Sequence, residues 1–243
     1  MYKSIAKYYD LLGWGEFHDA SYPRLRPLLE SNKSQTYLDL ACGTGSLAFT
    51  VARMGINVVG LDKSSEMLTM AQRRLRLFTV KPKPEFIRGD MTRFNLKRKF
   101  DAVGCFFDAA NHILTERGFV NFINCAAKHL KPGGFFIFDV NTALGLQRWD
   151  AVLFTERGEH ALLMKGTYDR HTRIASITIT GFVRMADGKK DRFKETFYEL
   201  GFPHKFIMST LKKAGFERIE AVSAGKDRTL RNAGRVFYTA YKS

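Results

Sequence analysis

The sequence has few cysteines and no apolar run long enough to cross a membrane. Its three cysteines, Cys42, Cys105 and Cys125, are an odd number without the spacing of a metal-binding motif, and each lies among apolar residues. We therefore expect reduced thiols in a cytoplasmic protein. No stretch approaches roughly 18 apolar residues, and the N-terminus resembles no secretory signal, so we expect no membrane partner. The six histidines form no close pair, and we predict no metal site.

Acidic residues are also scarce. The chain has 24 Asp and Glu residues against 39 Lys and Arg residues, a formal net charge of +15. Between residues 73 and 99 the only acids are Glu85 and Asp90, whereas the basic residues there are Arg73, Arg74, Arg76, Lys81, Lys83, Arg88, Arg93, Lys97, Arg98 and Lys99. This segment is either a solvated surface or a binding surface for RNA, DNA or an anionic substrate. Because no aromatic-rich recognition motif accompanies it, nucleic acid is possible but not favoured.

A glycine turn between residues 37 and 48 organises the chain. The apolar run that begins at Tyr37 reads as a strand, and the pattern that begins near Ser46 reads as a helix. Gly43 and Gly45 allow the backbone between them to turn sharply and to approach a ligand closely. The positive end of the helix then faces the turn.

Two cofactors are compatible with these glycines. Gly43, Gly45 and Ala48 fit the pattern of a nicotinamide-dependent oxidoreductase. Asp39 argues against it, because a carboxylate beneath the turn would repel a pyrophosphate. The same carboxylate suits a cationic ligand without phosphate, namely S-adenosylmethionine.

Further strands follow with polar residues at their ends. Residues 57–62 form a second apolar run that ends in Asp62, about 20 residues after the turn, where an acid can accept hydrogen bonds from both ribose hydroxyls. Residues 84–91, 100–107 and 135–140 continue the alternation of strands and helices. These units predict an α/β fold with a doubly wound, Rossmann-like sheet.

Three stretches resemble the class I S-adenosylmethionine-dependent methyltransferases. They are the D-x-x-x-G-x-G pattern that starts at Asp39, the second motif at 61–68, and the L-K-P-G-G turn at 130–134. The resemblance implies a seven-stranded sheet whose last strand is antiparallel. It also implies that the cofactor is bound by Tyr9, Asp39, Ala41, Gly43, Gly45, Asp62, Lys63, Met67, Asp90, Met91, Phe106 and Phe107.

The domain organisation is a single methyltransferase domain. Residues 1–33 read as a helical cap, residues 34–141 and 203–243 as the core, and residues 142–202 as an antiparallel β insertion over the substrate site. We expect three insertion strands, at about 161–168, 173–185 and 191–200. The resemblance implies that Tyr168, Phe182, Phe197 and Tyr198 line the substrate pocket.

Methyl transfer from a sulfonium requires positioning more than an elaborate catalytic apparatus. A base is needed only if the acceptor carries a proton. His112 and Asp108, in the loop after the fourth strand, are the candidate catalytic residues, with His204 and Glu195 as weaker ones. A structural hydrogen bond is the alternative role for His112.

The chain therefore reads as an enzyme that methylates a nitrogen or oxygen of a small molecule. Its order of segments is similar to that of glycine N-methyltransferases and aminosugar N,N-dimethyltransferases. The alternatives are an RNA methyltransferase that uses the basic segment, an NAD-dependent oxidoreductase, and a cofactor-binding protein without activity. The pattern leaves the acceptor and the oligomeric state open.

Overall fold

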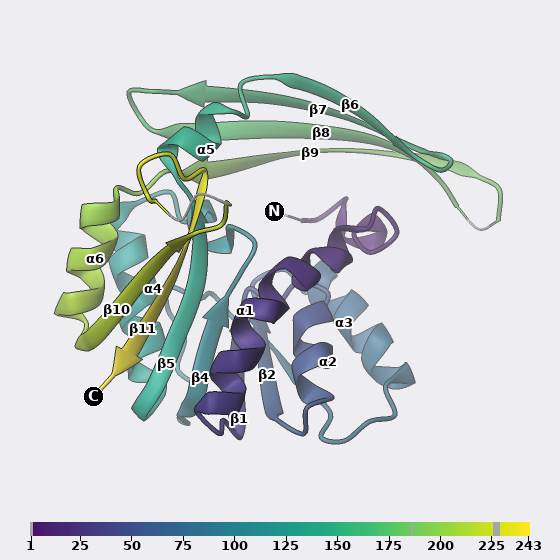
Figure 1. Ribbon diagram of the computed structural model, residues 1–243. Coiled ribbons are helices and arrows are strands. Elements are labelled where there is room, and N and C mark those ends of the chain that lie inside the picture. The colour runs from purple at the N-terminus through teal and green to yellow at the C-terminus, as the bar shows by residue number, and fades with distance from the viewer. Residues whose placement is uncertain (1, 186, 226–228) are drawn as a thin grey trace.

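A seven-stranded mixed sheet forms the centre of the molecule in the computed structural model, which describes residues 2–185, 187–225 and 229–243 (Figure 1). The strands are β1 (Thr36–Leu40), β2 (Asn57–Asp62), β3 (Glu85–Arg88), β4 (Phe100–Cys105), β5 (Leu130–Asn141), β10 (Phe216–Ser223) and β11 (Arg235–Lys242). Their order is β10-β11-β5-β4-β1-β2-β3, and only β11 runs antiparallel to its neighbours. The predicted fold class is confirmed.

Helices cover both faces of this sheet. Helices α1 (His18–Ser31), α2 (Ser46–Ala52) and α3 (Ser65–Leu77) lie on one face, and α4 (Glu116–Lys128) and α6 (His204–Lys213) lie on the other. Side-chain caps begin two of these helices: the hydroxyl of Ser64 accepts from the amide of Met67, and that of Thr115 accepts from the amide of Gly118. No described helix combines the length and the apolar character that a membrane crossing would need.

The insertion is a second antiparallel sheet of four strands, one more than predicted. These strands are β6 (Val152–Arg157), β7 (His160–Asp169), β8 (Ile174–Arg184) and β9 (Lys190–Leu200), preceded by the short helix α5 (Ala143–Gln147). Strand β6 was missed because Val152, Leu153 and Phe154 are consecutive, exposed apolar residues rather than an alternating pattern. The sheet extends over the core like a roof (Figure 1).

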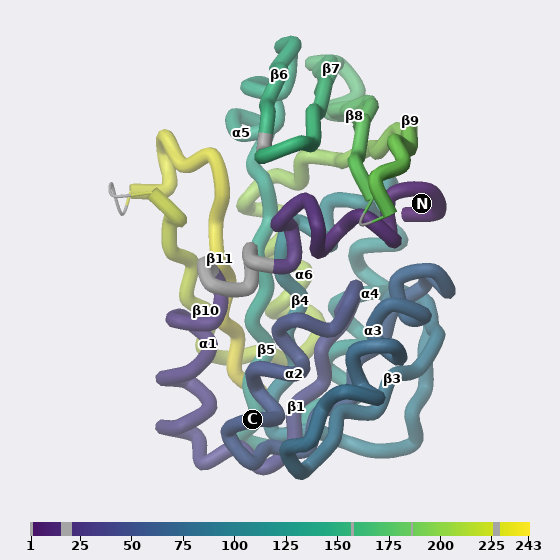
Figure 2. The backbone as a smooth tube through the Cα atoms, turned by 90° about the vertical axis from the view of Figure 1, so that its right-hand side faces the viewer, coloured from purple at the N-terminus to yellow at the C-terminus, as the bar shows by residue number. Residues whose placement is uncertain are grey.

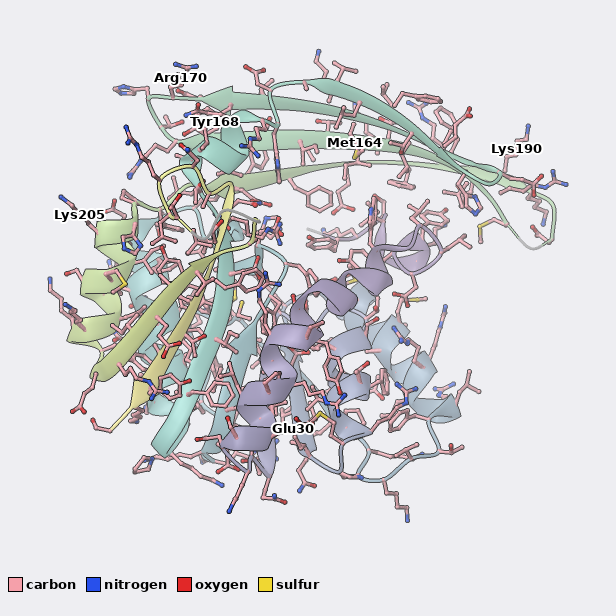
Figure 3. All side chains as sticks on the ribbon, viewed as in Figure 1. Glu30, Met164, Tyr168, Arg170, Lys190 and Lys205 are labelled. Atoms are coloured by element: carbon pink, nitrogen blue, oxygen red, sulfur yellow. The ribbon has the colours of Figure 1, made fainter. Side chains whose placement is uncertain are left out.

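The N-terminal segment lies between this roof and helices α2 and α3 (Figure 2). It contains the 3₁₀ turns η1 (Ala6–Tyr8) and η2 (Trp14–Phe17) before α1 begins, so the predicted helical cap is helical only in part. Ile5, Tyr8 and Leu12 pack against Phe193 and Phe197 of β9. Figure 3 shows other side chains of the roof, Met164 among them, on the same side of the sheet.

One carboxylate also fastens the segment to the roof. Glu195 of β9 accepts hydrogen bonds from the backbone N–H groups of Lys3, Ser4 and Ile5, at 3.0, 3.1 and 3.2 Å. The Ser4 hydroxyl donates a fourth bond at 3.0 Å. The role of Glu195 here is therefore to hold the N-terminal segment in place.

Replacing Phe122 by Ala tests how α4 is held. This ring is fully buried, and its centroid lies 5.5 Å from that of Phe136 and 5.9 Å from that of Phe138 on the sheet. We expect Phe122→Ala to lower the free energy of unfolding by about 3–5 kcal/mol, measured by urea denaturation. Leu77→Ala, at an exposed position, should change it by less than about 0.5 kcal/mol. Equal losses in the two variants would contradict this account.

Candidate active site

A cavity of about 680 Å³ opens where the strands β1, β2, β3 and β4 end, beneath the N-terminal segment. Eleven of the residues predicted to bind a cofactor line it: Tyr9, Asp39, Ala41, Gly43, Asp62, Lys63, Met67, Asp90, Met91, Phe106 and Phe107. Residues from the ends of four neighbouring strands therefore meet in one place, as a parallel sheet requires. His112 lines the cavity as well, but Gly45 and Asp108 do not.

The two glycines of the turn have different functions. Gly43 has a φ of +56° and lines the cavity, and a Cβ built on it would meet open space. The backbone is thus bare where a ligand would approach. Gly45 has a φ of +80° and precedes α2, and a Cβ there would lie 2.6 Å from the Phe86 ring. Its role is to make the turn and to pack against β3.

The carboxylate of Asp62 joins two loops at the cavity. One oxygen accepts from the amide of Gly43 at 2.8 Å, and the other accepts from the amide of Ser64 at 2.8 Å. Burial raises the pKa of Asp62, although these backbone hydrogen bonds oppose the shift. Each oxygen keeps a further lone pair, so the group can still accept hydrogen bonds from a ligand.

Asp39 is the most unusual group in the cavity. It is 3% exposed, and one of its oxygens accepts a long hydrogen bond of 3.4 Å from the Tyr37 hydroxyl. Its Oδ2 atom is buried and has no partner among the residues that the structure describes. Burial raises the pKa of Asp39 to about 8. A buried carboxylate that lacks a partner favours a cation, which is the behaviour expected of it from the sequence.

Asp90 is placed by its own loop after β3. Its Oδ1 atom accepts from the amide and the hydroxyl of Thr92, and its Oδ2 atom lies 3.2 Å from the Lys63 ammonium. Partial burial would raise the pKa of Asp90, but these bonds lower it overall. Asp90 therefore remains ionised beside the cavity, with Met91 following it in the lining.

Tyr9 closes the cavity from the N-terminal side. Its hydroxyl is buried, and this burial raises its pKa far above the usual value. The next residue, Asp10, accepts from the Thr44 hydroxyl at 2.8 Å and pairs with Arg74 at 3.3 Å. The segment is thus bonded directly to the glycine turn.

His112 ends the 3₁₀ turn η3 (Ala109–His112) and has a defined tautomer. Its Nδ1 atom lies 2.9 Å from the carbonyl oxygen of Tyr198, which can only accept, so Nδ1 carries the proton of the neutral ring. Nε2 is then an acceptor, and it lies 3.3 Å from the Tyr2 hydroxyl. Burial raises the pKa of Tyr2, so its hydroxyl stays protonated and donates to Nε2. The ring thus presents a hydrogen-bond acceptor towards the cavity.

Asp108 belongs to a buried ionic network behind the cavity. Its Oδ1 atom is 2.6 Å from Arg235, and its backbone N–H donates to Asp139 at 3.1 Å. Burial opposes its ionisation, but Arg235 holds the pKa of Asp108 below the usual value. The side-chain amide of Asn141 donates to the other carboxylate oxygen of Asp108 at 3.1 Å. Both oxygens are therefore bonded within the protein, so Asp108, a candidate catalytic residue from the sequence, holds the loop in position and does not line the cavity.

The same network reaches the roof through Glu199. Burial and the charge of Asp108 raise the pKa of Glu199 well above its usual value, so this group is a neutral acid that donates to Asp108. Asn141 donates to Glu199 at 3.0 Å. The buried side chain of Asn111 donates to the carbonyl oxygens of Asn141 and Leu200, each at 2.9 Å. The loop that carries His112 is therefore fixed from both sheets.

Other residues of the network and the cavity were missing from the sequence prediction. They are Tyr2, Asn111, Asp139, Asn141, Glu199 and Arg235. Asp139 could have been found, because it is an acid near the end of a predicted strand. Of the four aromatic residues expected to line the pocket, none does: Phe182 and Tyr198 are exposed on the outer face, Tyr168 lies towards the end of the roof near α5 (Figure 3), and Phe197 packs on Tyr2.

Known proteins share this architecture. Residues 38–134 match a family described as a methyltransferase domain. A solved S-adenosylmethionine-dependent methyltransferase from Clostridium acetobutylicum is 26% identical, with a TM-score of 0.81, over 95% of this chain and 91% of that one. These similarities identify the chain as an S-adenosylmethionine-dependent methyltransferase. This methyltransferase is thus an enzyme whose cofactor is S-adenosylmethionine.

Relatives by sequence include YqeM of Bacillus subtilis strain 168, which is named as a methyltransferase. It is 27% identical over 100% of this chain and 98% of its own length. A dTDP-3-amino-3,4,6-trideoxy-alpha-D-glucopyranose N,N-dimethyltransferase of Streptomyces venezuelae is 33% identical over 55% of this chain and 56% of its own. The cavity fits the cofactor, since it offers a buried carboxylate without a partner and an open glycine.

The raised pKa of Asp39 predicts that cofactor binding is linked to proton release. A cation favours the ionised carboxylate, whereas below pH 8 the free methyltransferase holds Asp39 mainly as the acid. We therefore expect affinity for the cofactor to increase from pH 6 to pH 8, with up to one proton released on binding at pH 7. Calorimetry in two buffers of different ionisation enthalpy measures this release.

Asp39→Asn is the matched control for this experiment. The amino group of the cofactor titrates in the same pH range, so the ratio of wild-type to variant affinity isolates the contribution of Asp39. That ratio should rise as the pH increases. A ratio that stays constant from pH 6 to pH 8 would contradict the assignment.

The ionic network gives a second prediction. Arg235→Met leaves Asp108 and Asp139 buried without their cation, and we expect the free energy of unfolding to fall by about 3 kcal/mol. Glu199→Gln keeps a neutral donor towards Asp108, and we expect a loss of less than about 1 kcal/mol. Urea denaturation at pH 7 compares the two. A decrease in the free energy of unfolding for Glu199→Gln that is larger than the decrease for Arg235→Met would contradict the assignment of Glu199 as a neutral donor.

Proposed function

We propose that this methyltransferase transfers a methyl group to a nitrogen or oxygen of a small molecule. The observation that carries the proposal is the closed setting of His112, whose Nε2 atom meets the Tyr2 hydroxyl beneath the N-terminal segment and the roof. A site covered in this way suits a compact acceptor. The names of relatives that act on aminosugars support the same class of substrate.

The free thiols of Cys42, Cys105 and Cys125 fit the cytoplasmic location that we propose.

The cofactor would be held by residues from three strand ends. Asp39 would face its cationic amino acid end, Asp62 would accept from the ribose hydroxyls, and Asp90 would face the adenine amino group. When bound, the cofactor supplies an activated methyl group on a sulfonium. The contribution of the protein is to exclude water and to hold the acceptor atom in line with the methyl carbon.

His112 would then orient the acceptor and take its proton. The carbonyl oxygen of Tyr198 fixes the ring with Nε2 as the acceptor of a hydrogen bond. An ammonium or hydroxyl of the substrate can donate to this atom, in the place where Tyr2 donates now. Transfer of that proton to Nε2 would leave the acceptor atom with the lone pair that methyl transfer requires.

Methyl transfer to RNA finds less support from the position of the charges. Most of the exposed basic residues of the 73–99 segment lie at the opposite ends of the strands from the cavity. A polynucleotide bound there would not bring a base to His112. A membrane-free assay with small molecules is therefore the first test.

The test is label transfer from methyl-labelled cofactor to a panel of small amines, aminosugars and phenols, with a tRNA mixture as a separate acceptor. We expect transfer to a small molecule, and we expect His112→Ala to reduce kcat roughly 10²–10⁴-fold while cofactor affinity stays unchanged. His112→Gln controls for the loss of packing around Tyr2. Transfer to tRNA alone would refute the proposal.

A further inference from the structure

A strongly basic surface lies at the N-terminal ends of the strands. It comprises the exposed side chains of Arg73, Arg76, Lys81, Lys83, Lys97, Arg98 and Lys99, and we refer to it as the basic edge. These residues come from the second half of α3, the loop before β3 and the residues before β4. The ion pair of 2.7 Å between Arg98 and Glu85, at the start of β3, brings these segments together.

Most of this charge is not neutralised by the protein. Glu85 is the acid within the basic edge, and it is committed to Arg98. The other six basic side chains form no ion pair with any residue that the structure describes. The lysines of the basic edge are therefore available to an anionic partner.

Two apolar side chains close in sequence to residues of the basic edge are exposed as well. Leu77 is 84% exposed, and Val80, three residues on, is 39% exposed. Arg73, Arg76 and Leu77 lie on one face of α3, at positions i, i+3 and i+4. A leucine exposed to this extent contributes nothing to the core, and its neighbours Arg73 and Arg76 on the same face carry charges that attract a polyanion.

The basic edge is separate from the active site. The cavity lies at the carboxyl ends of the strands, beneath the roof, whereas the basic edge lies at the other end of the same strands (Figure 1). A partner bound at the basic edge would leave the entrance to the cavity free. A partner of the basic edge would therefore be distinct from the methyl acceptor.

We propose that the basic edge docks the enzyme onto a bilayer surface rich in anionic lipid. Clusters of four to eight Lys and Arg residues attract such surfaces, and an aliphatic side chain among them adds apolar burial in the interface. Nucleic acid is the less suitable partner, because the described part of the basic edge exposes no large aromatic side chain on which bases could stack. This proposal departs from the expectation of no membrane partner, which rested on the lack of a membrane-spanning run, because a peripheral contact requires no such run.

The test is flotation of the full-length protein with vesicles of phosphatidylcholine alone or of phosphatidylcholine and phosphatidylglycerol in equal parts. We expect binding to the anionic vesicles only, and weaker binding as salt is raised from 50 to 500 mM. Lys81→Gln with Lys83→Gln should lower the partition coefficient roughly 30-fold, about fivefold for each charge. Leu77→Ser should lower it roughly tenfold.

Control variants elsewhere on the surface, the affinity for the cofactor and the binding of a tRNA mixture complete the test. Lys212→Gln with Lys213→Gln, an equal change of charge on α6, and Leu163→Ser, at an exposed position on the roof, should leave binding unchanged. Cofactor affinity, measured by calorimetry, should be the same in all variants and shows that they are folded. Equal losses in the α6 variant, or equal binding to neutral vesicles, would overturn the proposal. So would binding of a tRNA mixture, without vesicle binding, that does not respond to Leu77→Ser.

Discussion

The two hydrogen bonds that Asp62 accepts hold the cavity together. One comes from the amide of Gly43 in the turn after β1, and the other comes from the amide of Ser64 at the start of α3. A single buried carboxylate thereby sets the distance between the loops of two neighbouring strands. Asp39, near the end of β1, and Asp90, in the loop after β3, line the same cavity as Asp62. The burial of Asp62 is costly, and the backbone donors make it tolerable.

The second constraint is the ionic network between core and roof. Asp139 and Asn141 of β5, Arg235 of β11 and Glu199 of β9 surround the loop after β4. In that loop Phe107 and Asp108 have φ values of +62° and +52°, a conformation that side chains adopt at a cost. The buried hydrogen bonds compensate for this cost. Because Glu199 is neutral, the network holds two carboxylates against one guanidinium without a further unpaired charge.

Local patterns in the sequence were sufficient for much of the fold and of the cofactor site. The strand, turn and helix around Gly43 are specified within a dozen residues, and Asp62 and Asp90 follow strands that are visible as apolar runs. Strand β6 escaped detection because its apolar residues do not alternate. Phe182 and Tyr198 were assigned to the wrong face, since the parity of pairing with Arg192 and Ser176 places both on the outside. Tyr2 bonds to His112 and Arg235 bonds to Asp108, and the partners in each pair are more than a hundred residues apart in the sequence. A local sequence pattern cannot predict such pairs.

The bonds from the N-terminal segment to Glu195 also bear on the order in which the chain assembles. Donor and acceptor are 190 to 192 residues apart in the sequence, so these contacts form only after β9 has been synthesised. Strands β1 to β5 and their helices require no residue beyond position 141 for their own pairing. On the ribosome, the glycine turn and the neighbouring strands can thus fold early, whereas residues 3–5 find their partner only after Glu195 has been synthesised. Enclosure of the cavity is therefore a late event in biosynthesis, and a truncated product would have an open cavity.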